Sequence, residues 1–181
     1  MNITIKKASI RGSLFLNYEF EQTDLGVKNN IKTNSDAPIH DDLRNAFRTL
    51  IPYYAFICEE IKNKSLVTKA LKEPELYLLD REVAPDESFF KYRVYGFNIK
   101  ENKGFESVEI SGSKQLDNHE EISFSTYDVD LADTEYPFLT ELNNAIEHLK
   151  GEVLAYMQSK SAPKAQMEMF GDEDGMEEDQ L

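Results

Sequence analysis

The segment from Phe89 to Ile99 constrains the fold more than any other, because large apolar residues recur along its whole length. Such a run is typical of a β-strand with apolar side chains on both faces. Gly96 interrupts the alternation and predicts a bulge. The residues expected on one face are Phe90, Tyr92 and Val94, and those expected on the other are Tyr95, Phe97 and Ile99.

Further strands are predicted after this segment. The turn at Glu101–Gly104 leads into Phe105–Ser111, where Val108 and Ile110 alternate with acidic residues. Another alternating strand is expected at Ile122–Thr126. Together these strands predict an antiparallel meander.

The N-terminal part has the same period. Residues 2–22 predict a hairpin that turns at Arg11-Gly12-Ser13. Residues 23–39 are rich in Asn, Asp, Gly and Thr, which predicts a loop with a short strand near Val27–Ile31. A further short apolar strand is predicted at Leu76–Leu79.

Two segments have helical spacing instead. Residues 41–62 place apolar side chains at steps of three and four, and Pro52 predicts a kink or a split after Leu50. A turn is expected to follow at Ser65–Lys72, and a second amphipathic helix is predicted at 137–158. The chain is therefore predicted to form an α+β domain at residues 1–158, with an antiparallel sheet of about five to six strands covered by two amphipathic helices. Residues 159–181 are expected to form a flexible tail, because Ser, Ala and Pro precede an acidic run.

Composition narrows the classes of function. The chain of 181 residues has a formal net charge of −14, of which residues 166–181 contribute seven acids and no Lys or Arg. This charge argues against general binding to phosphate backbones or membrane surfaces, although a local basic patch remains compatible with it. A single cysteine, Cys58, cannot form an internal disulfide. The absence of a signal peptide and of a long apolar run predicts a cytoplasmic protein with no membrane partner.

The C-terminal segment contains a pentapeptide suited to docking, Gln166-Met-Glu-Met-Phe170. Met169 and Phe170 can enter an apolar pocket while Gln166 bonds to backbone at the rim, and methionine adapts to pockets of variable shape. The peptide resembles the bacterial sliding-clamp-binding motif, Gln-Leu-x-Leu-Phe, with Met167 and Met169 in place of the two leucines. The resemblance implies a sliding clamp, or another replication protein, as partner. The alternatives are that these side chains extend the last helix, fold back on the body, or dock elsewhere.

The acidic run after Phe170 has two interpretations. It is either a solubilising tail, or a partner-recruiting tail. In the second interpretation it resembles the acidic C-terminal tails of single-stranded-DNA-binding proteins, although it lacks their aromatic tip.

Basic residues and aromatics alternate in the central strands, which is a pattern of single-strand binders. Residues 88–115 carry five bases against three acids. The residues predicted to bind single-stranded DNA are Lys91, Arg93, Tyr95, Lys100 and Lys103. The alternative is that the aromatics fill the core.

No catalytic motif is recognisable, so the chain is predicted to be neither an enzyme nor a cofactor-binding protein. His40-Asp41-Asp42 could hold a metal in principle, but the acids are more simply explained as partners of a helix N-terminus. Asp128, Asp130 and Asp133 could hold a hard cation, and the alternative is a solvated loop. No metal site is therefore predicted.

The segment Ile39–Glu60, together with the Gln-x-x-Met-Phe tail, is similar to uncharacterised bacteriophage proteins. We therefore expect a non-enzymatic accessory protein of phage DNA replication or recombination that docks on the host clamp. The alternatives are a phage protein that blocks a host factor, by binding it or by imitating DNA, and a purely structural interaction module. Oligomeric state does not follow from the sequence.

Overall fold

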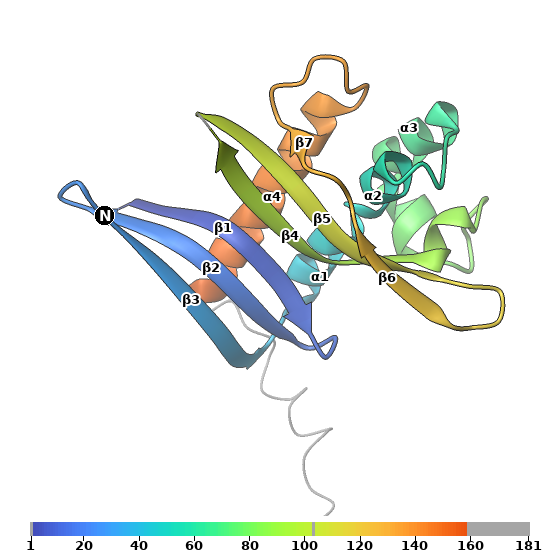
Figure 1. The fold of residues 1–181 in the computed structure, drawn as a ribbon. Coiled ribbons are helices and arrows are strands. Elements are labelled where there is room, and N and C mark those ends of the chain that lie inside the picture. Colours follow the sequence, from blue (N-terminus) through green and yellow to red (C-terminus); the bar gives the residue numbers. More distant parts are fainter. Residues whose placement is uncertain (1, 103, 159–181) are drawn as a thin grey trace, which may run out of the picture.

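The computed structural model describes residues 2–102 and 104–158, and it confirms the α+β class. One antiparallel sheet has the strand order β3-β2-β1-β4-β5-β6, and a short strand β7 also pairs with β5 (Figure 1). The strands are β1 (Asn2–Arg11), β2 (Phe15–Asp24), β3 (Val27–Pro38), β4 (Tyr92–Asn102), β5 (Phe105–Gln115), β6 (Glu121–Ser125) and β7 (Val129–Asp130).

The predicted loop at residues 23–39 is wrong, because most of it is β3. This strand of twelve residues pairs with β2 from Asp24↔Val27 to Phe15↔Pro38. Its sequence is polar because it lies at the rim of the sheet, where most of its side chains face solvent. Backbone pairing along β2 therefore decides its conformation despite a composition typical of loops.

The predicted helix at 41–62 is split, as Pro52 suggested. Helix α1 (Asp41–Arg48) ends before Thr49, and α2 (Ile51–Ile57) starts with the proline in its first turn. The predicted turn that follows is instead a helix, α3 (Lys64–Lys72), because the Asn63 side chain accepts hydrogen bonds from the amides of Ser65 and Leu66.

The predicted strand at Leu76–Leu79 is also wrong. Glu75–Leu79 form a single π-helical turn, η1, followed by a 3₁₀ turn, η2 (Ser88–Lys91). Tyr77 and Leu78 are buried in η1. A short apolar run fits a buried helical turn as well as a strand, and here packing against neighbouring elements decides.

The bulge predicted at Gly96 is confirmed, but the predicted division of the faces is wrong. The register with β5 shifts between Val94 and Gly96, leaving Tyr95 without a strand partner. One extra residue reverses the alternation, so Tyr92 and Val94 before the bulge lie on the same face as Phe97 and Ile99 after it. All four are buried, whereas Tyr95 is half-buried.

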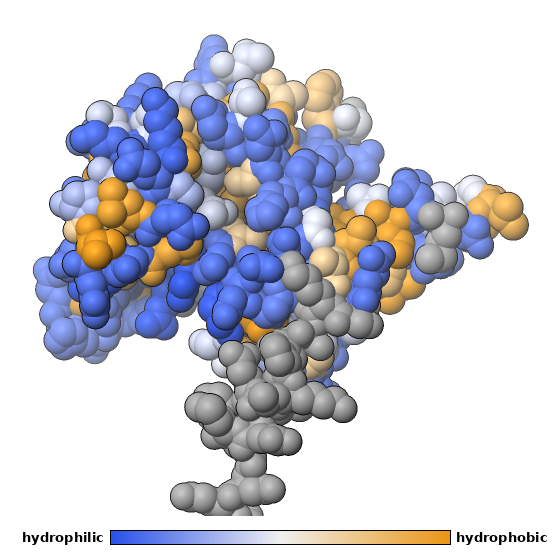
Figure 2. Space-filling view, turned by 180° about the vertical axis from the view of Figure 1, so that it is seen from behind, coloured by the Kyte–Doolittle hydropathy of each residue, from blue (hydrophilic) through white to orange (hydrophobic). Residues whose placement is uncertain are grey.

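The core lies between this face of the sheet and the helices. The last helix, α4 (Leu139–Met157), buries a stripe at helical spacing and packs against α1 and β1. Its C-terminal end is tied to β3, because the Tyr156 hydroxyl bonds to Ser35 Oγ at 2.7 Å and to the carbonyl of Ala37. Apolar side chains also gather where the sheet projects beyond the helices (Figure 2). Leu25 and Val27 are exposed at the turn between β2 and β3.

Candidate functional site

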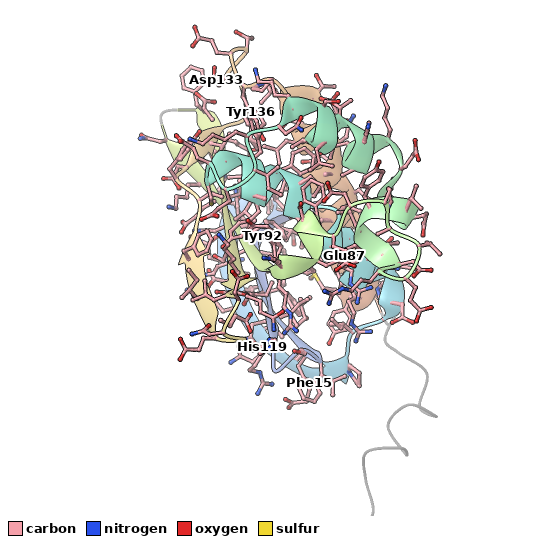
Figure 3. All side chains as sticks on the ribbon, turned by 90° about the vertical axis from the view of Figure 1, so that its right-hand side faces the viewer. Phe15, Glu87, Tyr92, His119, Asp133 and Tyr136 are labelled. Carbon is pink, nitrogen blue, oxygen red and sulfur yellow. The ribbon has the colours of Figure 1, made fainter. Side chains whose placement is uncertain are left out.

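A groove of about 820 Å³ lies where the start of β4 meets α1, η1 and η2. Figure 3 views this side of the molecule, with Tyr92 at the start of β4 and Glu87 on the loop before it. The groove is lined by residues from β1 and its turn (Ile10, Gly12, Ser13), from α1 and α2 (Arg44, Phe47, Arg48, Ile51), from η1, η2 and the loop between them (Leu78, Leu79, Arg81, Phe89, Phe90), and from β4 and β6 (Tyr92, Arg93, Val94, Tyr95, Glu121).

The groove has an apolar floor, and four arginines are among the residues that line it. Phe47, Phe89 and Tyr92 are at most 6% exposed and form the floor. Phe90 and Tyr95 are half-buried, so part of each ring reaches the groove. Four arginines also line the groove. Partly exposed rings beside guanidinium groups are the arrangement that holds unpaired bases and their phosphates.

Three of the four arginines contact an acid at the rim. Arg44 bonds Asp41 at 2.7 Å, Arg81 bonds Glu87 at 3.0 Å, and Arg93 lies 3.9 Å from Glu121. The side chain of Arg93 is 74% exposed, and its ion pair is the longest of the three. Arg48 instead bonds the neutral side-chain oxygen of Asn45 at 3.4 Å. Arg48 and Arg93 are therefore the cations most available to an incoming anion.

The structure places only two of the predicted nucleic-acid-binding residues in this groove, Arg93 and Tyr95. Lys91 bonds Asp117 at 3.0 Å and does not line the groove, and this bond lowers the pKa of Asp117. Lys100 bonds Glu109 and Asp128, each at 2.7 Å, and these bonds raise its pKa. It lies seven residues along β4 from Arg93, or about 23 Å in an extended strand. Lys103 lies outside the described residues.

Sequence reasoning missed Arg44, Arg48 and Arg81. Arg44 and Arg48 stand four residues apart on α1, a spacing that puts both side chains on one face of the helix. That spacing in the sequence could have indicated that the two arginines share a surface. Arg81 follows η1, which the sequence predicted as a strand, so the sequence pattern did not place Arg81 in the groove.

One row of the sheet, on the face opposite the helices, does not offer a stacking platform. This row crosses all six main strands through paired residues, and every member is small or polar. The row consists of Asn34, Asn17, Ser9, Gly96, Ser111 and Ser125. Because this row contains no aromatic ring, a base has nothing to stack on along it, whereas Phe90 and Tyr95 line the groove.

His40, Asp42 and Glu152 form a cluster in which one potential ligand atom from each lies within 4.8 Å of the others. His40 caps α1, because its Nδ1 accepts a hydrogen bond from the Leu43 amide at 3.1 Å. The neutral ring therefore carries its proton on Nε2, which lies 3.7 Å from Glu152. A metal ion bound at Nε2 would need the lone pair of that nitrogen, so the ring proton would have to move to Nδ1. Nδ1 could then no longer accept the hydrogen bond from the Leu43 amide, so a cation could bind through His40 only if the cap opened.

This geometry predicts that His40 stabilises the fold. Replacing His40 by Ala removes the cap and the contact with α4, and should lower the free energy of unfolding by about 1–2 kcal/mol. Urea denaturation followed by circular dichroism measures the change. The control is His148→Ala on the exposed side of α4, which should change stability by less than about 0.5 kcal/mol. Equal effects of the two substitutions would contradict a capping role.

The aspartates near β7 do not converge. Asp128 pairs with Lys100, while Asp130 and Asp133 accept hydrogen bonds from the amides two residues further along the chain. Within residues 2–102 and 104–158, the only group of three close ligand atoms is the one at His40.

Cys58 is half-buried, and burial is the main cause that raises the pKa of its thiol to about 11. Since only the thiolate reacts, Cys58 should react with a thiol reagent at pH 8 about two hundred times more slowly than a cysteine of ordinary pKa, about 8.5. The rate should rise as pH increases towards 11. Stopped-flow absorbance measures it, with the urea-unfolded chain as reference. Equal rates in the folded and unfolded chains would contradict the prediction.

The proposed docking residues Gln166, Met167, Met169 and Phe170 lie outside the described residues. No helix in the described part of the chain combines the length and apolar character needed to cross a membrane. Comparison with protein-family models, with curated proteins and with solved structures gave no match.

Proposed function

We propose that this protein is a non-enzymatic accessory of bacteriophage DNA replication or recombination that binds single-stranded DNA in the arginine-lined groove. The observation that supports this proposal is the convergence of four arginines and two partly exposed aromatic rings on one groove of about 820 Å³. These side chains come from segments far apart in the sequence, so their convergence is a property of the fold.

The chemistry of the groove suits a strand better than a small anion. A single phosphate needs a few converging donors, whereas this groove is lined by apolar and aromatic side chains together with its arginines. Stacking of one base on Tyr95 or Phe90 would contribute about 1–3 kcal/mol, and the arginines would neutralise neighbouring phosphates. Rings stack on all four bases, so binding would tolerate many sequences.

Fluorescence anisotropy with a labelled oligo-dT tests this proposal. We expect saturable binding at low ionic strength, with the logarithm of the association constant falling by about two to three per decade of salt, as for three or four neutralised phosphates. Duplex DNA of the same length should bind more weakly, because its bases are not free to stack. Absence of salt-sensitive binding to single strands would refute the proposal.

We also propose that the protein docks on the host sliding clamp through Gln166, Met167, Met169 and Phe170. Burial of two apolar side chains, less the cost of ordering the peptide, gives an expected dissociation constant in the micromolar range, ~1–100 µM. Titration of the full chain into a bacterial clamp by isothermal calorimetry measures it. Replacing both Met169 and Phe170 by Ala should abolish the heat signal, whereas Glu168→Gln should preserve it. Binding that survives the double substitution would assign the contact to another surface.

A further inference from the structure

We infer that β6 is a self-pairing edge through which two copies of this chain join their sheets into one continuous antiparallel sheet. Within the described residues, β6 pairs with β5 on one side only, and it forms the rim of the sheet in Figure 1. The backbone groups on its other side therefore have no strand partner among those residues. An exposed edge of this kind is a template for pairing with another strand.

The hydrogen bonds at both ends of β6 show which of its backbone N–H and C=O groups face away from β5. The Leu116 amide donates to the Glu120 carbonyl at 2.7 Å, and the Thr126 amide donates to the Ile110 carbonyl at 2.9 Å. In an antiparallel ladder the direction of these groups alternates from residue to residue. The even-numbered residues of β6 therefore bond to β5, and the backbone groups of Glu121, Ser123 and Ser125 face away from it.

The two rims of the sheet differ in their protection. The other rim strand, β3, carries Lys28, Lys32 and Pro38, which are residues that discourage edge pairing. In contrast, β6 has no lysine and no proline. Ile122 of β6 is 45% exposed, and Tyr127, two residues beyond the end of the strand, is 66% exposed. They stand beside a hollow of about 360 Å³ that Ile57, Cys58 and Phe124 also line.

The strand is complementary to itself about Ser123. Antiparallel pairing of two copies through their outward groups places Ser123 opposite Ser123, with the two-fold axis between them. Glu121 then lies opposite Ser125 of the second copy, so the like charges do not face each other. Ile122 lies opposite Phe124 of the second copy, where side chains in a pair of this kind approach closely. These apolar residues would cover the exposed surface beside each hollow.

The contact is short, so the dimer should be weak and concentration-dependent. Sedimentation velocity of the full chain from about 1 µM to about 1 mM should show a reversible shift from monomer to dimer. Ser123→Pro removes an outward donor but no bond to β5, and should abolish dimerisation, while Ser123→Thr should preserve it. Ile122→Asp keeps every backbone donor and should also abolish dimerisation, because it places a charge opposite Phe124.

Cross-linking tests the register. On a Cys58→Ser background, Ser123→Cys should form an intermolecular disulfide on mild oxidation, because paired Cα atoms at the axis lie about 5.5 Å apart. Ser125→Cys is the control, since its two copies would lie about 13 Å apart. A chain that stays monomeric at all concentrations would overturn the inference. A dimer that survives Ser123→Pro and Ile122→Asp, or equal cross-linking at both positions, would overturn it as well.

Discussion

Replacing Arg48 and Arg93 together by glutamine is expected to weaken the binding of single-stranded oligo-dT about 100-fold. Each side chain would lose a charge-assisted contact with phosphate worth about 1.5 kcal/mol, and tenfold in affinity corresponds to about 1.4 kcal/mol. Of the four arginines, these two are the most available to phosphate, because Arg48 bonds the neutral side chain of Asn45 and Arg93 has the longest ion pair. The slope of affinity against salt should become shallower by about 1.4, as for the loss of two phosphate contacts on a single strand.

A matched control separates the groove from net charge. Lys28→Gln together with Lys64→Gln removes the same charge from β3 and α3, outside the groove. This pair should change the affinity less than about threefold, because neither lysine lines the groove and salt screens the attraction between exposed charges and a strand bound elsewhere. Equal losses in the two double variants would mean that general electrostatic attraction, and not the groove, binds the strand.

Replacing Gly112 by Ala is expected to lower the free energy of unfolding by about 2–4 kcal/mol. A Cβ atom there would lie 2.4 Å from the carbonyl oxygen of Arg93 and 2.8 Å from Cζ of Tyr54, closer than atoms can approach. Tyr54 cannot easily move away, because it is fully buried, stacks on Phe124 at 5.0 Å and donates a hydrogen bond to the Phe124 carbonyl at 3.1 Å. Overpacking costs about 1–3 kcal/mol, and loss of the hydrogen bond from Tyr54 costs about 1 kcal/mol more.

Urea denaturation of the variant measures this cost, and Gly151→Ala in α4 is the control. A Cβ at Gly151 meets no atom within 4 Å, and alanine is the better helix former, so stability should rise by about 0.5–1 kcal/mol. Because Gly112 holds the backbone at Arg93, Gly112→Ala should also weaken oligonucleotide binding. A Gly112 variant as stable as the wild type would show that Tyr54 can be displaced without cost.

Patterns within one segment predicted the parts of the fold that depend on local chemistry. The period of two in residues 2–22 and after Phe105, and the helical period in α4, follow from which side chains must leave water. The break before α2 follows from a property of Pro52 alone, its missing backbone donor.

The failed predictions lie where pairing or packing with another segment decides the conformation. β3 is a strand because β2 supplies its hydrogen bonds, and η1 is a helical turn because of what packs around Tyr77 and Leu78. The bulge at Tyr95 was visible as an interruption, but its consequence, one shared face for Val94 and Phe97, depends on the register with β5.

The sequence by itself determined the α+β class, the main helices and most strands, because hydrophobic period and turn chemistry act over a few residues. Only the tertiary structure decided which charged residues meet. It gives Lys91 and Lys100 acidic partners outside the groove, while it brings Arg44 and Arg48 of α1, and Arg81 of the loop after η1, into one groove with Arg93. The physical reason is that an interaction site consists of side chains that share a surface, and the order of strands and helices around the core determines which surface each side chain reaches.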